Sequence, residues 1–263
     1  MSARKTTLLV TAAAICLAVA EQSLAQFQPP PVPPRPASAK DAAPEDLTGY
    51  WVSVVTEDWR WRMLTPAKGD YTSLPLNPEG RKVADTWDAA KDVAAGSPCK
   101  AYGAAGLMRL PTRLHLTWQD NNTLKIETDE GTQTRLFHFD GKLPQGQAPS
   151  LQGYSAAEWD ISRPTNMGFQ APPGMAGKLP GSLKVVTTSL RPGYLRKNGV
   201  PYSGNAVLTE YFTRTHEPNG DSWLILTSIV EDPQYLTSPL LTSTHYKKEG
   251  DGSKWSPSAC EAK

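Results

Sequence analysis

The chain has 263 residues, with 27 Lys and Arg against 26 Asp and Glu, which gives a formal net charge of +1 at pH 7. A charge this even offers no attraction to a nucleic acid backbone or to an anionic membrane surface, so we expect neither as a partner. The length allows one large domain or two small ones.

The first 25 residues have the pattern of a secretory signal peptide. Arg4 and Lys5 precede the apolar run Leu8–Ala20, and Ser23–Ala25 provides a small-x-small cleavage site. The apolar run is too short to span a bilayer. We therefore predict cleavage after Ala25 and a soluble, periplasmic or secreted mature chain with no membrane span.

Export changes the expected state of the cysteines. After cleavage the chain keeps Cys99 and Cys260. An even pair in an oxidising compartment most often forms a disulfide, which we predict here.

A Pro-rich stretch follows the cleavage site. Residues 26–46 include Pro29–Pro36, where six of eight residues are proline, and such a composition favours extended polyproline conformation over a packed core. We predict a disordered tether over residues 26–46 and a single β-barrel-like domain over residues 47–263.

Tryptophan and arginine alternate soon after the start of this domain. Trp59 and Trp61 alternate with Arg60 and Arg62, which in a strand places the indoles on one face and the guanidiniums on the other. The indole face is either packed in the core or forms a stacking platform for a flat ligand.

One helix is expected near residues 78–92. Asn77 is a suitable N-cap, Pro78 fits the first helical position, and Val83, Ala84 and Trp87 form an apolar stripe. Three strands should follow as a meander, at Arg113–Trp118, Thr123–Thr128 and Thr132–Asp140.

Two features of the middle of the chain carry weaker signals. His115 and His138 lie on strands of this meander without the spacing of a metal site, so we expect no metal. Residues 141–181 are rich in Pro, Gly and Met, broken by a short ordered piece around Gly153–Ile161, and have the length of a disordered segment or a functional lid.

Four further strands organise the carboxyl-terminal part of the domain. Asn219-Gly220 joins the second to the third and is a strong hairpin signal. The third strand is apolar on both faces, so we expect it to be covered on both sides. The four strands are Ser182–Leu190, Asn205–Thr215, Ser222–Glu231 and Leu240–Lys247.

Glu210 lies between Leu208 and Phe212 on one face of its predicted strand. Because a lone buried carboxylate is costly, the side chain either faces solvent or pairs with a neighbouring Arg or Lys. The alternative is that Glu210 points into a barrel lumen and anchors a ligand there.

Motifs of common enzyme classes are absent from the sequence. We find no Gly-x-Ser-x-Gly elbow, Walker A loop, dinucleotide fingerprint or Cys-x-x-Cys pair. We therefore predict no cofactor, and the sequence leaves open whether the protein is an enzyme.

Landmarks are spread across the domain: Leu47–Trp51, Leu76–Arg81, Cys99 with Tyr102-Gly103 and Met108, Gly153–Trp159, Thr209–Arg214 and Asp232–Pro239. Together they resemble a family of uncharacterised secreted bacterial proteins. The resemblance implies an exported β-rich domain and carries over no catalytic residue. The opening Gly49-Tyr50-Trp51 is similar, more loosely, to the Gly-x-Trp opening of lipocalins.

Eight or nine strands and one helix predict an all-β antiparallel meander that forms a closed or nearly closed, lipocalin-like barrel. We expect such a protein to bind a small apolar or aromatic ligand in the lumen. The predicted ligand-binding residues are Trp59, Trp61, Arg135, Glu210, Tyr211, Phe212 and Trp223.

Two alternatives remain open. One is a periplasmic hydratase, isomerase or cyclase that uses a lumen carboxylate for acid–base chemistry. The other is an interaction protein that binds an envelope partner through the Pro-rich tether.

Overall fold

The computed structural model describes residues 36–161 and 181–262. The predicted signal peptide, most of the Pro-rich region and much of the 141–181 segment lie outside the described residues. Residues 37–263 form one compact unit.

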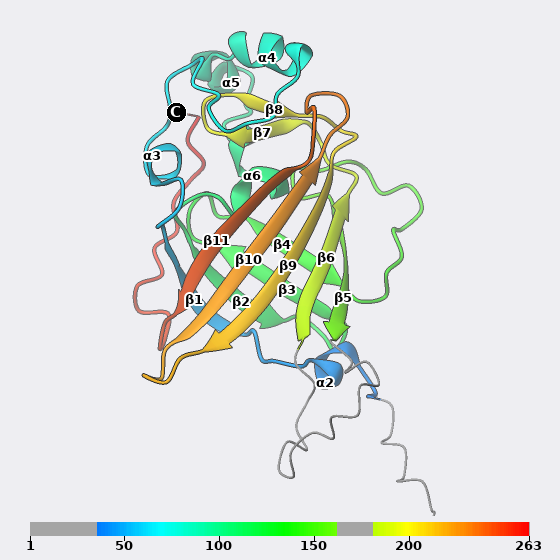
Figure 1. Cartoon of the computed structure of the whole chain (residues 1–263). Coiled ribbons are helices and arrows are strands. Elements are labelled where there is room, and N and C mark those ends of the chain that lie inside the picture. The colour runs from blue at the N-terminus through cyan, green and yellow to red at the C-terminus, as the bar shows by residue number, and fades with distance from the viewer. Residues whose placement is uncertain (1–35, 162–180, 263) are drawn as a thin grey trace, which may run out of the picture. The chain divides into compact units, whose positions relative to one another are not determined.

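Nine strands of the described residues close into a barrel (Figure 1). Around the barrel they follow the order β1-β11-β10-β9-β6-β5-β4-β3-β2, so chain neighbours pair and the last strand meets the first. The predicted all-β barrel is confirmed. The strands are β1 (Gly49–Val54), β2 (Arg113–Trp118), β3 (Thr123–Thr128), β4 (Thr134–His138), β5 (Tyr154–Ile161), β6 (Gly181–Thr188), β9 (Val207–His216), β10 (Ser222–Glu231) and β11 (Leu240–Lys248).

One pairing departs from the antiparallel meander. β4 and β5 are parallel, with Phe137 opposite Ser155, whereas the other strand pairs of the barrel are antiparallel. A parallel pair needs a connection long enough to return the chain to the end where it started. Residues 139–153 provide that connection.

The barrel interior is filled by alternate side chains of the strands. Trp51, Leu114, Phe137, Phe212 and Tyr246 have essentially no exposed surface. Together with their apolar neighbours they form the main core of the domain. Burial of large apolar side chains of this kind supplies most of the free energy that favours folding.

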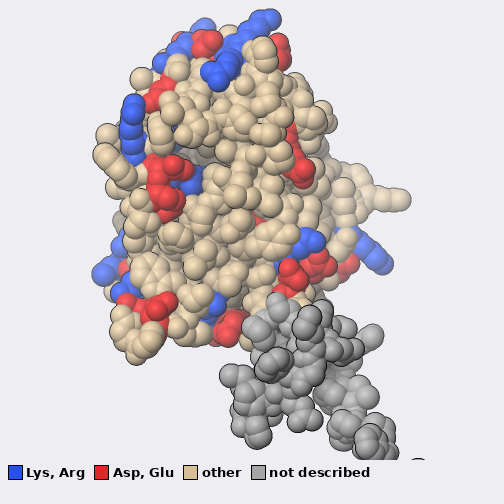
Figure 2. Space-filling model, in the orientation of Figure 1, with Lys and Arg blue, Asp and Glu red and all other residues tan. Residues whose placement is uncertain are grey.

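The outward face of β10 corrects one expectation. Trp223, Ile225 and Ile229 point away from the interior and stay partly exposed, although we expected cover on both sides of this strand. Figure 2 shows that the barrel wall facing the viewer is largely uncharged. The apolar run therefore reflects an uncharged outer wall and not a second layer of structure.

Short elements gather at one end of the barrel and are called the cap here (Figure 1). The cap contains a second apolar cluster that includes Leu76, Ala84, Leu195 and Val230. Its elements are α4 (Pro78–Asp85), α5 (Ala89–Ala94), η1 (Lys100–Tyr102), α6 (Ala104–Leu107) and the hairpin β7–β8 (Gly193–Arg196 and Val200–Tyr202).

The helix expected near residues 78–92 is present as two helices, α4 and α5. The predicted N-cap is confirmed, because the Asn77 side chain accepts a hydrogen bond of 2.8 Å from the Gly80 amide. The helix breaks after Asp85, and Asp88 caps the second helix by accepting a 3.0 Å hydrogen bond from the Ala90 amide.

The alternating Trp–Arg segment is a helical turn, α3 (Trp59–Arg62), and not a strand. Asp58 precedes it with a φ of 51°, in the left-handed region, which turns the chain away from the barrel wall after β1. Trp59 and Trp61 therefore do not share one face, and Trp59 is 62% exposed.

Two terminal segments are fixed to the barrel. Within the predicted tether, α2 (Ala39–Ala42) is ordered, and the Ala39 carbonyl accepts a 2.7 Å hydrogen bond from the Trp159 indole. The predicted disulfide between Cys99 and Cys260 is present and joins the carboxyl terminus to the start of η1. No helix among the described residues is long and apolar enough to span a membrane.

Candidate functional site

A buried ion pair occupies the barrel interior. Arg135 of β4 reaches Glu210 of β9 with two hydrogen bonds, Nη1–Oε1 of 3.0 Å and Nη2–Oε2 of 2.6 Å. The side chains are 1% and 0% exposed. Glu210 thus points into the barrel, as one alternative expected, and pairs with an arginine, as the other expected.

Hydroxyl groups extend this pair into a polar layer. Arg135 also donates a 3.1 Å hydrogen bond to Thr187, whose hydroxyl lies 2.8 Å from that of Ser155. Along β9, Leu208 belongs to the cap cluster and Phe212 to the main core, with Glu210 between them. The polar layer therefore separates the two apolar clusters.

Side chains pack directly against the ion pair on its core side. The rings of Phe137 and Phe212 lie 5.5 Å apart, and the Arg135 guanidinium lies 4.9 Å from the centre of the Phe137 ring. Both oxygens of Glu210 accept hydrogen bonds from Arg135. The carboxylate is thus already neutralised from within the protein.

The structure brings together only some of the predicted ligand-binding residues. Arg135, Glu210 and Phe212 meet inside the barrel. Tyr211 and Trp223 lie on the outer wall of β9 and β10.

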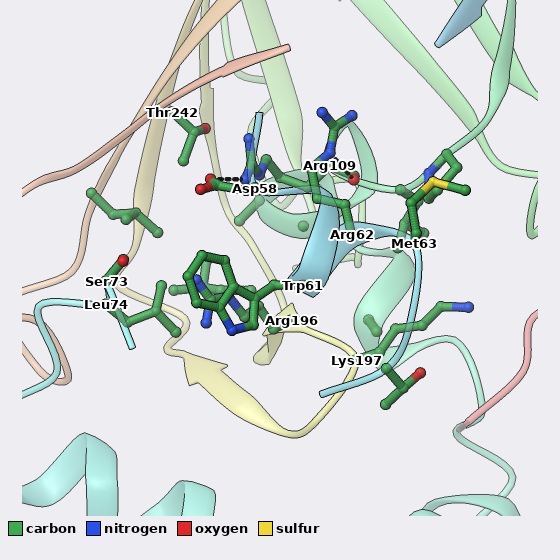
Figure 3. Close-up of a pocket in the computed structure, with 18 of the residues that line it drawn as sticks. Asp58, Trp61, Arg62, Met63, Ser73, Leu74, Arg109, Arg196, Lys197 and Thr242 are labelled. Carbon is green, nitrogen blue, oxygen red and sulfur yellow. Dashed lines mark hydrogen bonds and ion pairs between the residues drawn. The ribbon is translucent and has the colours of Figure 1, made fainter. Parts of the chain in front are cut away.

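A pocket of about 520 Å³ opens between α3, the cap and the ends of β10 and β11 (Figure 3). We call it the mouth pocket. Among the predicted residues it contains only Trp61. Its lining comes from separate parts of the chain: Asp58 and Trp61–Thr65 with Ser73 and Leu74; Ala101, Ala105, Gly106 and Arg109–Pro111 with Glu130; the hairpin residues Leu195–Lys197; and Val230 with Leu240–Thr242.

The rim of the mouth pocket is apolar and open to solvent. Met63, Leu64 and Leu241 line the pocket and are 55%, 71% and 66% exposed. Together with Trp59 they make up four of the six large hydrophobic side chains that are exposed among the described residues. Clustered exposed apolar side chains around a cavity are typical of a binding site.

Two arginines of the pocket are held by acids. Arg62 pairs with Glu57 and donates a 2.9 Å hydrogen bond to the Arg109 carbonyl. Arg109 pairs with Asp58 and donates a 3.0 Å hydrogen bond to the Ser243 carbonyl. Figure 3 shows Arg109 facing Asp58 along the upper side of the pocket. These contacts fix α3 to the barrel end.

Arg196 is bound differently. Its guanidinium lies 5.0 Å from the centre of the Trp61 indole, and Figure 3 shows the two side chains against each other. The Nη1 atom is buried and has no hydrogen-bond partner among the described residues. Burial lowers the pKa of Arg196 from its ordinary value, while the charge of Asp58 acts in the opposite direction.

Backbone conformation also distinguishes this pocket. The described residues include four with positive φ other than glycine, and two of them, Asp58 at 51° and Ser73 at 65°, line the mouth pocket. Non-glycine residues in this region cost free energy and concentrate at functional sites. This observation is independent of the pocket's shape.

Sequence reasoning missed Arg109, Arg196 and Lys197. Arg196 and Lys197 belong to the hairpin β7–β8, which lies between the predicted strands Ser182–Leu190 and Asn205–Thr215, where we predicted no element. A signal was present, because Asn198-Gly199 separates two short strands and Gly199 has a φ of 82°. Arg109 lies in a segment without periodicity, so nothing in the sequence marks it.

Comparison with known protein families, with curated proteins and with solved structures finds no match to this chain. Among the described residues, no group of three or more His, Cys, Asp or Glu side chains is placed to hold a metal ion. The site is therefore interpreted from its geometry.

Proposed function

We propose that this protein is an exported binding protein that takes up a small, partly apolar molecule in the mouth pocket. The observation that carries the proposal is the cavity of about 520 Å³ whose rim exposes Met63, Leu64 and Leu241. A volume of this size suits a ligand of drug-like dimensions, and small-molecule sites are mostly apolar with a few polar groups.

Export is supported by two independent features. Residues 1–25 carry the charge, apolar run and small-residue site of a signal peptide. The disulfide between Cys99 and Cys260 needs an oxidising compartment to persist.

The proposed ligand site lies at the barrel end and not in the barrel lumen, where we expected it from the sequence. Around Arg135 and Glu210 the interior is occupied by packed side chains, and the carboxylate is bound by the arginine. An acid–base enzyme that uses this carboxylate has less support for the same reason. Exposed Trp59, beside the pocket rim, favours an envelope interaction protein as the second candidate.

The proposal is tested with N-phenyl-1-naphthylamine, a neutral aromatic probe whose fluorescence rises in apolar sites. We expect saturable binding of one probe per protein. The double variant Leu64→Ser with Leu241→Ser should weaken binding by about tenfold, because it replaces two apolar contacts by hydroxyls.

A matched control is Leu143→Ser, since Leu143 is also an exposed leucine and does not line the mouth pocket. This variant should leave the affinity unchanged. Absence of saturable binding, or equal affinity in the rim variant and the unmodified protein, would overturn the proposal.

A further inference from the structure

We infer that the ligand of the mouth pocket is an amphipathic anion, whose carboxylate or other oxyanion head pairs with Arg196 while its apolar body lies against Trp61 and the rim. The inference rests on the proposed function and adds the chemical class of the ligand. Three features support it: the charges of the pocket lining, the absence of an ion pair at Arg196 within the described chain, and the position of Trp61.

The charged side chains of the lining are not balanced. Four are cations, Arg62, Arg109, Arg196 and Lys197, and two are acids, Asp58 and Glu130. Asp58 forms an ion pair with Arg109, and Glu130 forms one with Lys197, with 3.5 Å between Oε1 and Nζ. Arg62 is held by Glu57, which lies outside the lining.

Within the described chain, Arg196 is therefore the one cation of the pocket lining that forms no ion pair. A charged group without a partner is unfavourable when it is partly withdrawn from water. Arginine keeps its proton under ordinary conditions, so the charge is not relieved by deprotonation. An anion entering the pocket supplies the ion-pair partner that Arg196 lacks, and a guanidinium binds an oxyanion through two parallel hydrogen bonds.

Nearby acids do not fill this role. Asp58 and Asp70 favour the charge of Arg196 electrostatically. Asp58 is bound to Arg109, and Asp70 accepts hydrogen bonds from Arg60 at 3.2 Å and from the Trp61 indole at 3.1 Å. Both carboxylates are therefore committed to other donors.

Trp61 joins the charged and apolar parts of the pocket. Its indole nitrogen is bound to Asp70, which fixes the orientation of the ring beside Arg196. The Met63 and Leu64 side chains continue the apolar surface toward solvent. A ligand with one anionic head and an apolar or aromatic body matches this order of groups.

Two fluorescent probes that differ by one charged group test the inference. 8-Anilino-1-naphthalenesulfonate has the aromatic body of N-phenyl-1-naphthylamine and adds a sulfonate. We expect the anionic probe to bind at least about tenfold more tightly, as expected for one hydrogen-bonded charge. Arg196→Gln should remove this preference, so that the ratio of the two affinities falls to about one.

Arg60→Gln is the matched control, because the Arg60 guanidinium also lies near the Trp61 ring, 5.6 Å from its centre, but is exposed, paired with Asp70 and outside the lining. It should preserve the preference. Arg196→Lys should keep a reduced preference, since it retains the charge and loses the two-pronged geometry. Circular dichroism establishes that each variant is folded.

The outcomes separate the two proposals. Equal affinity for both probes, or a preference that survives Arg196→Gln, would overturn the inference that the ligand is an anion. The mouth pocket would still be the binding site if the rim variant weakens binding of the neutral probe. Failure of both probes to bind would overturn the proposed function as well. Because the pocket is open to solvent, salt partly screens the charge of Arg196, so raising the salt concentration should weaken binding of the anionic probe more than that of the neutral probe.

Discussion

Two arginines in this protein have similar surroundings and opposite states. Arg135 in the barrel and Arg196 in the mouth pocket both lie about 5 Å from the centre of an aromatic ring, Phe137 for the first and Trp61 for the second. Each has one buried nitrogen without a hydrogen-bond partner among the described residues, Nε in Arg135 and Nη1 in Arg196. Arg135 forms an ion pair with Glu210 through two hydrogen bonds, whereas Arg196 forms no ion pair within the described chain. The difference teaches that an internal carboxylate partner separates a structural arginine from a candidate ligand contact.

The largest effect expected from this comparison is on stability. Glu210→Gln leaves the Arg135 charge buried without compensation and should lower the free energy of unfolding by about 3–5 kcal/mol. Arg196→Gln should cost only about 0.5–1 kcal/mol, the value of a cation–π contact. Urea denaturation of the two variants measures both changes.

A double variant sharpens this prediction. Arg135→Met combined with Glu210→Leu removes both charges and should recover most of the loss, because an apolar pair of similar volume avoids desolvation of the ions. Equal stability of Glu210→Gln and the unmodified protein would show that the ion pair does not contribute to the stability of the fold.

The disulfide should have the second largest effect, and it should act mainly on the cap. Cys99 and Cys260 are separated by 161 residues, and closing a long loop typically stabilises a protein by about 2–4 kcal/mol. Replacing both cysteines by serine should lower the denaturation midpoint. Hydrogen exchange should rise first in η1 and α6, next to the mouth pocket, and later in β9 and β10; uniform exchange across both regions would contradict this order.

The hairpin that carries Arg196 gives a smaller and more local effect. At Gly199, φ is 82°, and an added Cβ would lie 2.1 Å from Trp87 Cγ. Gly199→Ala should therefore destabilise the protein by about 1–3 kcal/mol and weaken the anionic probe. Gly220 is the matched control: its φ is 88° but a Cβ meets nothing within 4 Å, so Gly220→Ala should cost less and leave probe binding intact.

Alkaline pH gives the smallest expected effect because it acts outside the neutral range. Burial, followed by the hydrogen bond to Asp85, raises the pKa of Tyr71 in the cap to about 12. Burial, followed by Asp140, also raises the pKa of Tyr154 in the barrel to about 12. In the unfolded chain a tyrosine loses its proton near pH 10.

The unfolded state therefore releases these protons first as the pH rises. The contribution of these two tyrosines to stability should be constant below about pH 9 and fall between about pH 10 and 12. Tyr71→Phe should make this fall shallower, as measured by thermal denaturation at pH 8 and at pH 11. An unchanged slope would show that Tyr71 titrates equally in both states.

The barrel was predictable where a strand alternates strictly. The bounds of β2, β3 and β10 agree with the prediction to the residue, because one face of each strand fills the core. The Trp59–Arg62 segment misled the prediction, since its period of two also fits a helical turn of four residues. The left-handed conformation of Asp58, which no pattern announces, decides between them.

The candidate site was less accessible from sequence than the fold. Glu210 stood out because it lies between Leu208 and Phe212 on one strand face, and Arg135 was correctly grouped with it. The mouth pocket is assembled from segments far apart in the chain, with Trp61, Arg109, Arg196 and Leu241 each supplied by a different one. The proximity of these residues depends on how the cap folds over the barrel end. The local periodicity of the sequence carries no information about that arrangement.

The pairing of β1 with β11 has a consequence for how the chain folds during synthesis. Trp51 lies opposite Lys248, so the barrel closes only when the last strand has been made. Until then β1 and β10 have free edges, and contacts between such distant segments make folding slow, on the order of milliseconds to seconds. A nascent chain of this protein therefore keeps the barrel open until β11 has been made, and its unpaired strand edges need protection from aggregation until then.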